Sequence, residues 1–450
     1  MAFRAEVFLP RSAVLGLLLA VSLAHSGQAQ TLEQALGEAY LTNPTLQGAR
    51  ADLRAVDEGV PAALAGWRPK ASIAAGGGYI DQLSGSNDNN SNTTFSSSNG
   101  PAVVLQLQAR QPIYDFYTGA NVDRAKQLVE AQRAQLQATE QSVLLQAVDA
   151  YMAVLRAQEL KQSRINYLQT LDRNVDSARR LRDKEIIGEG ALAEAISQRA
   201  AALADVTQAD GALATAQDQY EQVIGSAPTD LRLPNLPQGL PASQNETVAL
   251  STGVPGIAAA KYAESAAKSG VEASTGARLP RFDLQSTVDA RSAAIYGLMT
   301  VTLFDGTLDP RVRQSKQQAI KARYDLDAQD RQARSAAISA WQGFETARAQ
   351  VPAINEQVRA AEIAAQNARR ENALGLRTVT DLLTIESRDE QARVSLLTAE
   401  TNLRTAAYKL LAAVGRLNAR DLGLEVPLYN DQAYYEENKD KWFGTGPDIQ

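Results

Sequence analysis

Two short stretches decide the fold of this chain: QPIYDFYTG at residues 111–119 and VTLFDGTLD at residues 301–309. Each closes a run of alternating apolar and polar residues with an aromatic residue and an aspartate, Asp115 in the first and Asp305 in the second. Each is followed by a long segment rich in Ala, Gln and Arg, which favours a helix. The chain therefore makes the same strand-to-helix transition twice, about 190 residues apart.

Tandem repetition explains this recurrence. Matching residues recur in the two halves of the chain at shifts of 190, 211 and 187 residues. The pairs are Asp115 with Asp305, Pro44 with Pro255, Pro69 with Pro280, and Gly188 with Gly375. The change between the first two shifts comes from the polar stretch 81–100, for which the second half has only residues 291–294. Such self-similarity indicates two structural repeats of about 200 residues each.

The first 29 residues have the features of a secretory signal peptide. A positively charged start precedes an apolar run at 13–24, and the small residues Gly27 and Ala29 precede the expected cleavage point. No other segment approaches the roughly 18 consecutive apolar residues of a transmembrane helix. We therefore expect an exported mature chain without a transmembrane helix.

The composition argues against several classes of protein. The chain has no cysteine, and its one histidine, His25, lies in the signal peptide, so the mature chain lacks the residues of His-based triads and His/Cys zinc sites. The formal net charge of −6 argues against a nucleic-acid partner. We expect no enzymatic activity, no metal and no cofactor.

Alternating patterns predict two strands in each repeat. Residues 102–110 and 282–291 alternate apolar and polar side chains, which is typical of a sheet with one apolar and one polar face. Strands of about ten residues have the length of a tilted membrane-spanning strand. An ordinary half-buried hairpin in a soluble domain fits the same periodicity, so both interpretations stay open at this point.

Long helices flank these strands. Residues 120–187 contain neither glycine nor proline and would form a helix of roughly 100 Å. The helical segments 31–65 and 192–225 are each about half as long. Two short helices stacked end to end would match the long one, so each repeat would form a rod two helices thick.

These patterns predict the organisation of the whole chain. A signal peptide at 1–29 is followed by a first repeat at 30–225, an equatorial linker at 226–245, a second repeat at 246–415 and an equatorial tail at 416–450. The first repeat has strands at about 70–114, a long helix at 120–187, a tip turn at 188–191 and a helix at 192–225. The second has strands at about 281–304, a long helix at 311–374, a tip turn at 375–377 and a helix at 378–414. Pro69, Pro280, Asp115 and Asp305 mark the strand–helix junctions, and Gly188 and Gly375 the tip turns.

Strand number points to an oligomer. Four strands cannot close a barrel, and lipid does not tolerate an open strand edge. Eight strands from two chains would leave a lumen filled by side chains, whereas three chains supply twelve. The predicted fold class is an α+β membrane protein, in which a long-helix α-barrel joins a β-barrel of four strands per chain and twelve per homotrimer.

The ordered, duplicated set of motifs resembles the TolC-like outer-membrane efflux and type I secretion channels. The resemblance is carried by the paired prolines, the two aromatic-Asp strand exits, GLRTVTDLL at 375–383 and DKWFG at 440–444. It covers essentially all of the mature chain. It implies a homotrimer with its β-barrel in outer-membrane lipid and its α-barrel in the periplasm. It also implies a periplasmic membrane-fusion adaptor and an inner-membrane transporter of the ABC or RND type as partners.

The resemblance also implies a gate at the periplasmic tip. Arg377 matches the gate arginine, Asp381 an aspartate of the aperture ring, and Glu194 an aspartate of the gate network in the first repeat. The chain departs from the family at Asn372, where a tyrosine is expected, and at Thr384, where a second aperture aspartate is expected. The residues alone also permit a structural interpretation, since Thr378 followed three residues later by Asp381 is nearly a capping box.

The leading hypothesis is therefore the outer-membrane exit duct of a tripartite pump, with drugs, other small molecules or type I secreted proteins as cargo. A periplasmic coiled-coil scaffold without a pore accounts for the helices and the signal peptide, but not for strands duplicated in step with the helices. A secreted hydrolase that uses carboxylates is disfavoured, since the mature chain has neither histidine nor cysteine.

Overall fold

The computed structural model describes residues 30–87, 93–289, 292–442 and 444–445. The expected signal peptide lies outside these residues. The chain divides into two compact units. Unit 1 comprises Met1–Thr45, Glu140–Val248 and Ala337–Leu428, and unit 2 comprises Leu46–Thr139, Ala249–Ala336 and Tyr429–Gln450.

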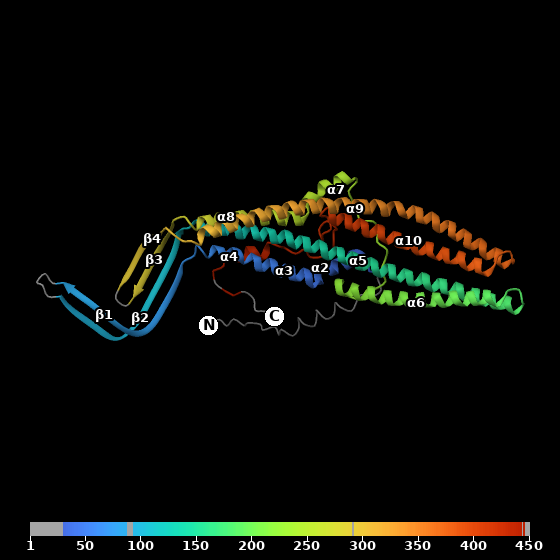
Figure 1. Cartoon of the computed structure of the whole chain (residues 1–450), viewed down its shortest axis with the longest axis horizontal. Helices are drawn as coiled ribbons and strands as arrows, with labels where there is room; N and C mark the ends of the chain where they lie inside the picture. The colour runs from blue at the N-terminus through green and yellow to red at the C-terminus, as the bar shows by residue number, and fades with distance from the viewer. Residues whose placement is uncertain (1–29, 88–92, 290–291, 443, 446–450) are drawn as a thin grey trace, which may run out of the picture. The chain divides into compact units, whose positions relative to one another are not determined.

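Helices dominate both units, and four strands lie in unit 2 (Figure 1). In chain order the elements are α2 (Leu32–Thr42), α3 (Pro44–Asp57), α4 (Gly59–Leu64), β1 (Lys70–Asn87), β2 (Thr93–Tyr114), α5 (Phe116–Asp183), α6 (Glu189–Ile224), α7 (Gln244–Leu250), the short 3-10 helix η2 (Ser251–Gly253), α8 (Pro255–Gly276), β3 (Arg281–Asp289), β4 (Ala293–Thr300), α9 (Leu308–Ala373), α10 (Val379–Ala413) and α11 (Ala433–Asn438).

The segment 31–65 is not the single helix that its composition predicts. It forms α2, α3 and α4, with a break at Asn43, whose backbone is extended. Pro44 follows as the first residue of α3, because proline disfavours the helical conformation of the preceding residue and cannot donate the helix hydrogen bond. The second repeat breaks at the matching position, where extended Val254 precedes Pro255 of α8.

The four strands form one antiparallel sheet in the order β1-β2-β3-β4 (Figure 1). β1 and β2 are 18 and 22 residues long, whereas β3 and β4 have 9 and 8, because the polar stretch 81–100 extends only the first hairpin. The ladder between β2 and β3 joins the two repeats, with Leu107 opposite Val288. The predicted four strands per chain are confirmed. In this described sheet, β1 and β4 each pair on one side only.

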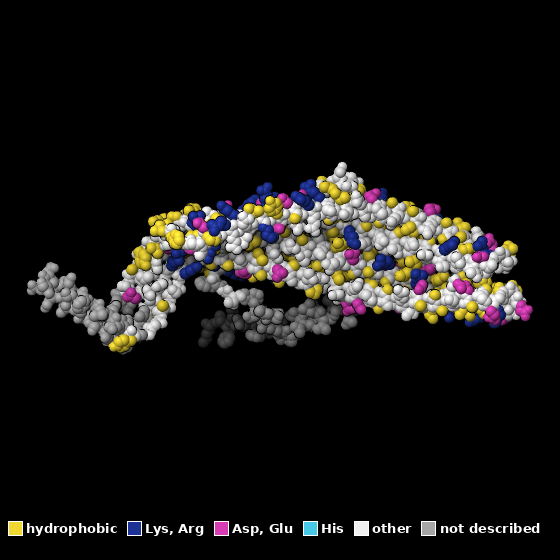
Figure 2. All heavy atoms as spheres, in the orientation of Figure 1, with side chains coloured by type: hydrophobic (Ala, Val, Ile, Leu, Met, Phe, Trp, Pro, Cys, Tyr) yellow, Lys and Arg dark blue, Asp and Glu magenta, His cyan; other side chains and the backbone are white. Residues whose placement is uncertain are grey.

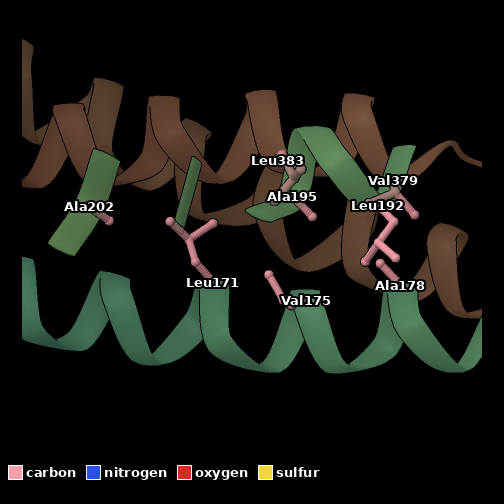
Figure 3. Packing of buried hydrophobic residues seen from close by; sticks show 8 residues of the cluster. All are labelled: Leu171, Val175, Ala178, Leu192, Ala195, Ala202, Val379 and Leu383. Atoms are coloured by element: carbon pink, nitrogen blue, oxygen red, sulfur yellow. The ribbon is translucent and has the colours of Figure 1, made fainter. Parts of the chain in front are cut away.

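Unit 1 is held together by narrow seams of small residues. Buried alanines recur every seven residues along α6, as is typical of coiled-coil packing. They are Ala195, Ala202, Ala209 and Ala216. Figure 3 shows two of these alanines, Ala195 and Ala202, in one apolar cluster with Leu171 and Val175 of α5 and Leu383 of α10. Small seams of this kind allow helix axes to lie close together over many turns.

The predicted linker, 226–245, lies within unit 1 and packs on its helices through polar contacts. Tyr151 of α5 is fully buried, and its hydroxyl lies 2.7 Å from the carbonyl oxygen of Arg232 and 2.9 Å from that of Gln30. Arg404 of α10 donates to the carbonyl oxygen of Pro234 at 2.8 Å. Buried hydroxyls and guanidinium groups need such partners, so these contacts determine where the linker crosses the helices.

Candidate functional site: the helical hairpin ends and the strand–helix junctions

Two helical hairpins end in unit 1, one between α5 and α6 and one between α9 and α10 (Figure 1). In the second, Gly375 has a φ of 74°, and its backbone N–H donates to the carbonyl oxygen of Asn372. In the first, Glu185 has a φ of 59°, and its N–H donates to the carbonyl oxygen of Arg182. Glu185 therefore occupies the place of Gly375, at the shift of 190 residues found at the strand exits.

The alignment of Gly188 with Gly375 is thus wrong. Gly188 is the N-cap of α6, with extended backbone, and corresponds to Thr378, the N-cap of α10. The residues 189–191, which were expected in the tip turn, form the first turn of α6. The alignment was wrong because a turn position with left-handed backbone favours glycine but does not require it.

At the second tip, Arg377 is held within its own hairpin. Its Nε donates to Oε2 of Glu371 at 2.7 Å, and its backbone carbonyl accepts a hydrogen bond from Nδ2 of Asn372 at 2.9 Å. Asn372, where the resemblance implies a tyrosine, thus joins the end of α9 to the turn. The arrangement closes the turn on itself.

Asp381 lies exposed in the first turn of α10. The Thr378 side chain accepts a hydrogen bond from the Asp381 N–H at 3.1 Å and donates one to Asp381 Oδ2 at 2.8 Å. The helix dipole favours a carboxylate at this place. The capping interpretation of these two residues is therefore confirmed.

Glu194 and Thr384 occupy equivalent places, one turn further along α6 and α10. Both are exposed. Glu194 accepts a hydrogen bond from Gln198 at 2.9 Å, and the Thr384 hydroxyl donates to the carbonyl oxygen of Thr380 at 3.0 Å. In the described part of the chain, no ion pair or hydrogen bond joins Glu194 to Arg377 or Asp381.

A buried polar link between the hairpins was not anticipated from the sequence. Glu386 of α10 is 3% exposed. Its carboxylate accepts a hydrogen bond from Arg369 of α9 at 2.7 Å and another from Asn174 of α5. One side chain therefore ties three helices together behind the tips.

Two further acidic residues continue this link along α10. Asp389 accepts a hydrogen bond from Arg393 at 3.3 Å, and Glu390 accepts one from Ser163 of α5 at 3.0 Å. Burial raises the pKa of Glu390, although Ser163 and Arg164 oppose that rise. The signal in the sequence was the spacing of Glu386, Asp389 and Glu390, since residues three and four apart share one helix face.

The aspartates of the two aromatic-Asp pairs lie at the approach to the long helices, Asp115 directly before α5 and Asp305 three residues before α9. Asp115 accepts hydrogen bonds from the N–H of Tyr117 at 3.1 Å and the hydroxyl of Thr118 at 2.6 Å, at the start of α5. Asp305 accepts them from the N–H and the hydroxyl of Thr307, at 2.8 and 2.7 Å, just before α9. Both aspartates satisfy backbone donors at the point where a strand gives way to a helix.

Proline marks the opposite junctions. Pro69 and Pro280 stand immediately before Lys70 of β1 and Arg281 of β3.

A buried ion-pair cluster lies at the seam between the repeats. Asp283 is 3% exposed and pairs with Arg110 at 2.8 Å and Arg281 at 3.6 Å. One buried carboxylate thus links two arginines from β2 and β3 where the sheet leaves the helices.

Comparison with known proteins assigns the family. The model of the family described as "Outer membrane efflux protein" matches residues 35–226. The outer membrane efflux protein BepC of Brucella suis biovar 1 (strain 1330) is 33% identical over 440 residues, which cover 93% of each chain. The chain belongs to the outer membrane efflux protein family. The outer membrane protein TolC of Escherichia coli (strain K12) is 21% identical over 426 residues, covering 88% of this efflux protein and 84% of TolC.

Solved structures show the same fold. The outer-membrane channel OprN matches with a TM-score of 0.74 and 21% identity, covering 85% of this efflux protein and 89% of that chain. The outer membrane protein VceC from Vibrio cholerae matches with a TM-score of 0.73 and 18% identity, covering 85% and 96%. The predicted resemblance to TolC-like channels is confirmed, and with it the outer-membrane location and the periplasmic place of the helices.

Two further findings describe this efflux protein. Among the described residues, no helix is both long and apolar enough to cross a membrane. The described acidic side chains do not gather into groups of three or more that could hold a metal ion. Among the relatives, BepC is named an outer membrane efflux protein and OprN an outer-membrane channel.

Proposed function

We propose that three copies of this efflux protein close a twelve-stranded barrel in the outer membrane and that their helices continue the duct into the periplasm. The observation that carries this proposal is the sheet, in which the described edge strands β1 and β4 pair on one side only. An unpaired edge in lipid leaves backbone groups without partners, so closure by further copies is needed. Three copies supply twelve strands, enough for an open lumen.

The apolar side chains of the sheet support a place in lipid. Ile73 of β1 lies opposite Leu107 of β2, which lies opposite Val288 of β3, so one row of apolar side chains crosses three strands. All three are exposed, Ile73 to 72%. In water, these exposed apolar side chains carry an unfavourable free energy of hydration. Contact with lipid removes it.

We assign gate roles to the tip residues as part of the same proposal. Threefold repetition would place three copies of Asp381 around one axis, where carboxylates favour cations. Arg377, with Asn372 and Glu371, would keep the turn closed. Glu194 would add an acidic group to the gate network at the first hairpin, whereas the neutral Thr384 at the equivalent place of the second hairpin would supply no second acidic ring.

The duct would work with a periplasmic membrane-fusion adaptor and an inner-membrane transporter of the ABC or RND type, which would supply the energy. In this proposal the chain itself catalyses no reaction. Small molecules and type I secreted proteins both remain candidate cargo. The relative BepC is described as an outer membrane efflux protein, which supports a role in export.

Single-channel recording tests this function. We expect the purified, detergent-extracted protein to have the mass of a trimer and to give small, cation-selective steps in a planar bilayer. A water-soluble protein that gives no steps would instead support a periplasmic scaffold. A monomer or dimer that conducts would contradict the proposed closure.

A further inference from the structure

Basic side chains gather in unit 2 where the strands meet the helices (Figure 2). We call this surface the junction belt and define it by the segments 66–72, 108–119, 276–284 and 301–313, together with Trp442. Its segments contain seven basic residues against four acidic ones, although the whole chain has a net charge of −6. The basic residues are Arg68, Lys70, Arg110, Arg278, Arg281, Arg311 and Arg313.

Ion pairs within the belt do not use up this positive charge. Asp283 serves two arginines, and Arg278 pairs with Asp309 at 3.1 Å. Lys70, Arg311 and Arg313 are exposed, and among the described residues none of these three forms an ion pair. The belt therefore presents an excess of positive charge to whatever lies against it.

Exposed aromatic and apolar side chains lie in the same segments. Leu303 and Phe304 are 94% and 93% exposed, and Phe116 and Tyr117 are also exposed. The Arg68 guanidinium lies over the ring of Trp442, 5.0 Å from its centroid. Aromatic rings beside cations are characteristic of the boundary between lipid and water.

We propose that the junction belt binds the headgroups of anionic phospholipids at the periplasmic face of the outer membrane. This inference rests on the proposed function, which places the sheet in lipid and the helices in the periplasm. The belt lies at the boundary between these two parts, where headgroup phosphates lie. Each basic residue near an anionic surface strengthens attraction about fivefold, and salt weakens it.

Tryptophan fluorescence can test this binding, because the chain carries its own reporters. Its three tryptophans are Trp67, Trp341 and Trp442. The substitution Trp341→Phe leaves Trp67 and Trp442 at the belt. The full chain would be reconstituted in phosphatidylcholine vesicles that contain a small, equal fraction of brominated phosphatidylglycerol or brominated phosphatidylcholine, since bromine quenches a neighbouring indole.

We expect brominated phosphatidylglycerol to quench the fluorescence more strongly at low salt. The double substitution Arg311→Gln, Arg313→Gln should lower that preference about fivefold for each charge removed. The matched control, Arg323→Gln with Arg331→Gln, removes the same charge from α9 more than 10 Å further along the helix and should leave the preference unchanged.

Equal quenching by the two brominated lipids would overturn the proposal. So would an identical response of the belt and control variants. If neither lipid quenches while the protein still conducts, another copy of the chain or a cell-wall polymer covers the belt, and only this inference fails. If the protein neither conducts nor is quenched, the proposed function fails as well.

Discussion

At the scale of the residue, the buried carboxylate of Asp57 makes the stability of the protein depend on pH. Asp57, at the end of α3, is 2% exposed, and neither of its carboxylate oxygens has a hydrogen-bond partner among the described residues. Burial raises its pKa to about 6, against the opposing charge of Arg133. Because this pKa is raised in the folded state, the stability linked to it is complete below about pH 4 and is lost as the pH rises through 6.

Asp57→Asn should therefore stabilise the protein at neutral pH by about 1–3 kcal/mol. Arg133 keeps its ion pair with Glu130, so the guanidinium retains a partner. Thermal unfolding of the detergent-solubilised protein at pH 7.5 and at pH 4 measures the effect, which should vanish at the lower pH. Asp52→Asn, at an exposed position of the same helix, is the control and should change neither melting temperature. A destabilised variant at pH 7.5 would show that Asp57 supports the fold as an anion.

Asp381→Asn should reduce the preference of the channel for cations and weaken block by multivalent cations. The amide keeps the shape of the side chain and can still accept a hydrogen bond from Thr378, so the cap should survive. Reversal potentials in a salt gradient measure the change. Asp218→Asn, at an exposed position of α6 away from the tip, removes the same charge and should leave the potentials as they are. Unchanged reversal potentials for Asp381→Asn would show that Asp381 does not line the aperture.

Arg377→Ala should raise the conductance of the closed state severalfold, because the side chain closes the tip turn through Glu371. The pair is partly exposed, so its contribution to stability is small, on the order of 0.5 kcal/mol. Glu371→Gln breaks the same ion pair from the other side and should have the same effect on conductance. A conductance equal to that of the wild type in both variants would exclude this latch.

At the scale of the element, the buried carboxylate of Glu386 matters because it joins α5, α9 and α10. Glu386→Gln leaves Arg369 without its ion partner and should lower the free energy of unfolding by about 1–3 kcal/mol. Amide hydrogen exchange should then rise in the hairpin α9–α10 and in the facing part of α5. Glu356→Gln breaks an exposed ion pair with Arg359 on α9 and is the control that should not change exchange. Unchanged exchange in Glu386→Gln would mean that the apolar cluster alone holds these helices.

At the scale of the whole molecule, the seam between the repeats decides whether one continuous sheet forms. Asp283→Ala removes the carboxylate that Arg110 and Arg281 share and should lower the free energy of unfolding by about 1–3 kcal/mol. We expect a lower temperature at which the trimer dissociates on a gel. Asp309→Ala, which breaks an exposed pair with Arg278, should leave that temperature unchanged. Equal behaviour of the two variants would show that backbone pairing alone holds β2 to β3.

Local chemistry made much of the architecture predictable from the sequence. Alternation predicts the strands, and long runs without glycine or proline predict α5. The aspartates after the strands are predictable as turning points, because a cap depends on a few neighbouring residues. The break before Pro44 could also have been foreseen, since proline acts on its immediate neighbour.

Tertiary structure decided what depends on segments far apart in the chain. The sequence by itself determined the duplication, the element types and their order, because these follow from local propensity and periodicity. It did not determine that Glu185 takes the left-handed place of Gly375, since a tight turn between packed helices overrides the preference for glycine. Nor did it determine the partners of Glu386, because burial of a carboxylate depends on which distant helices bring it a guanidinium and an amide.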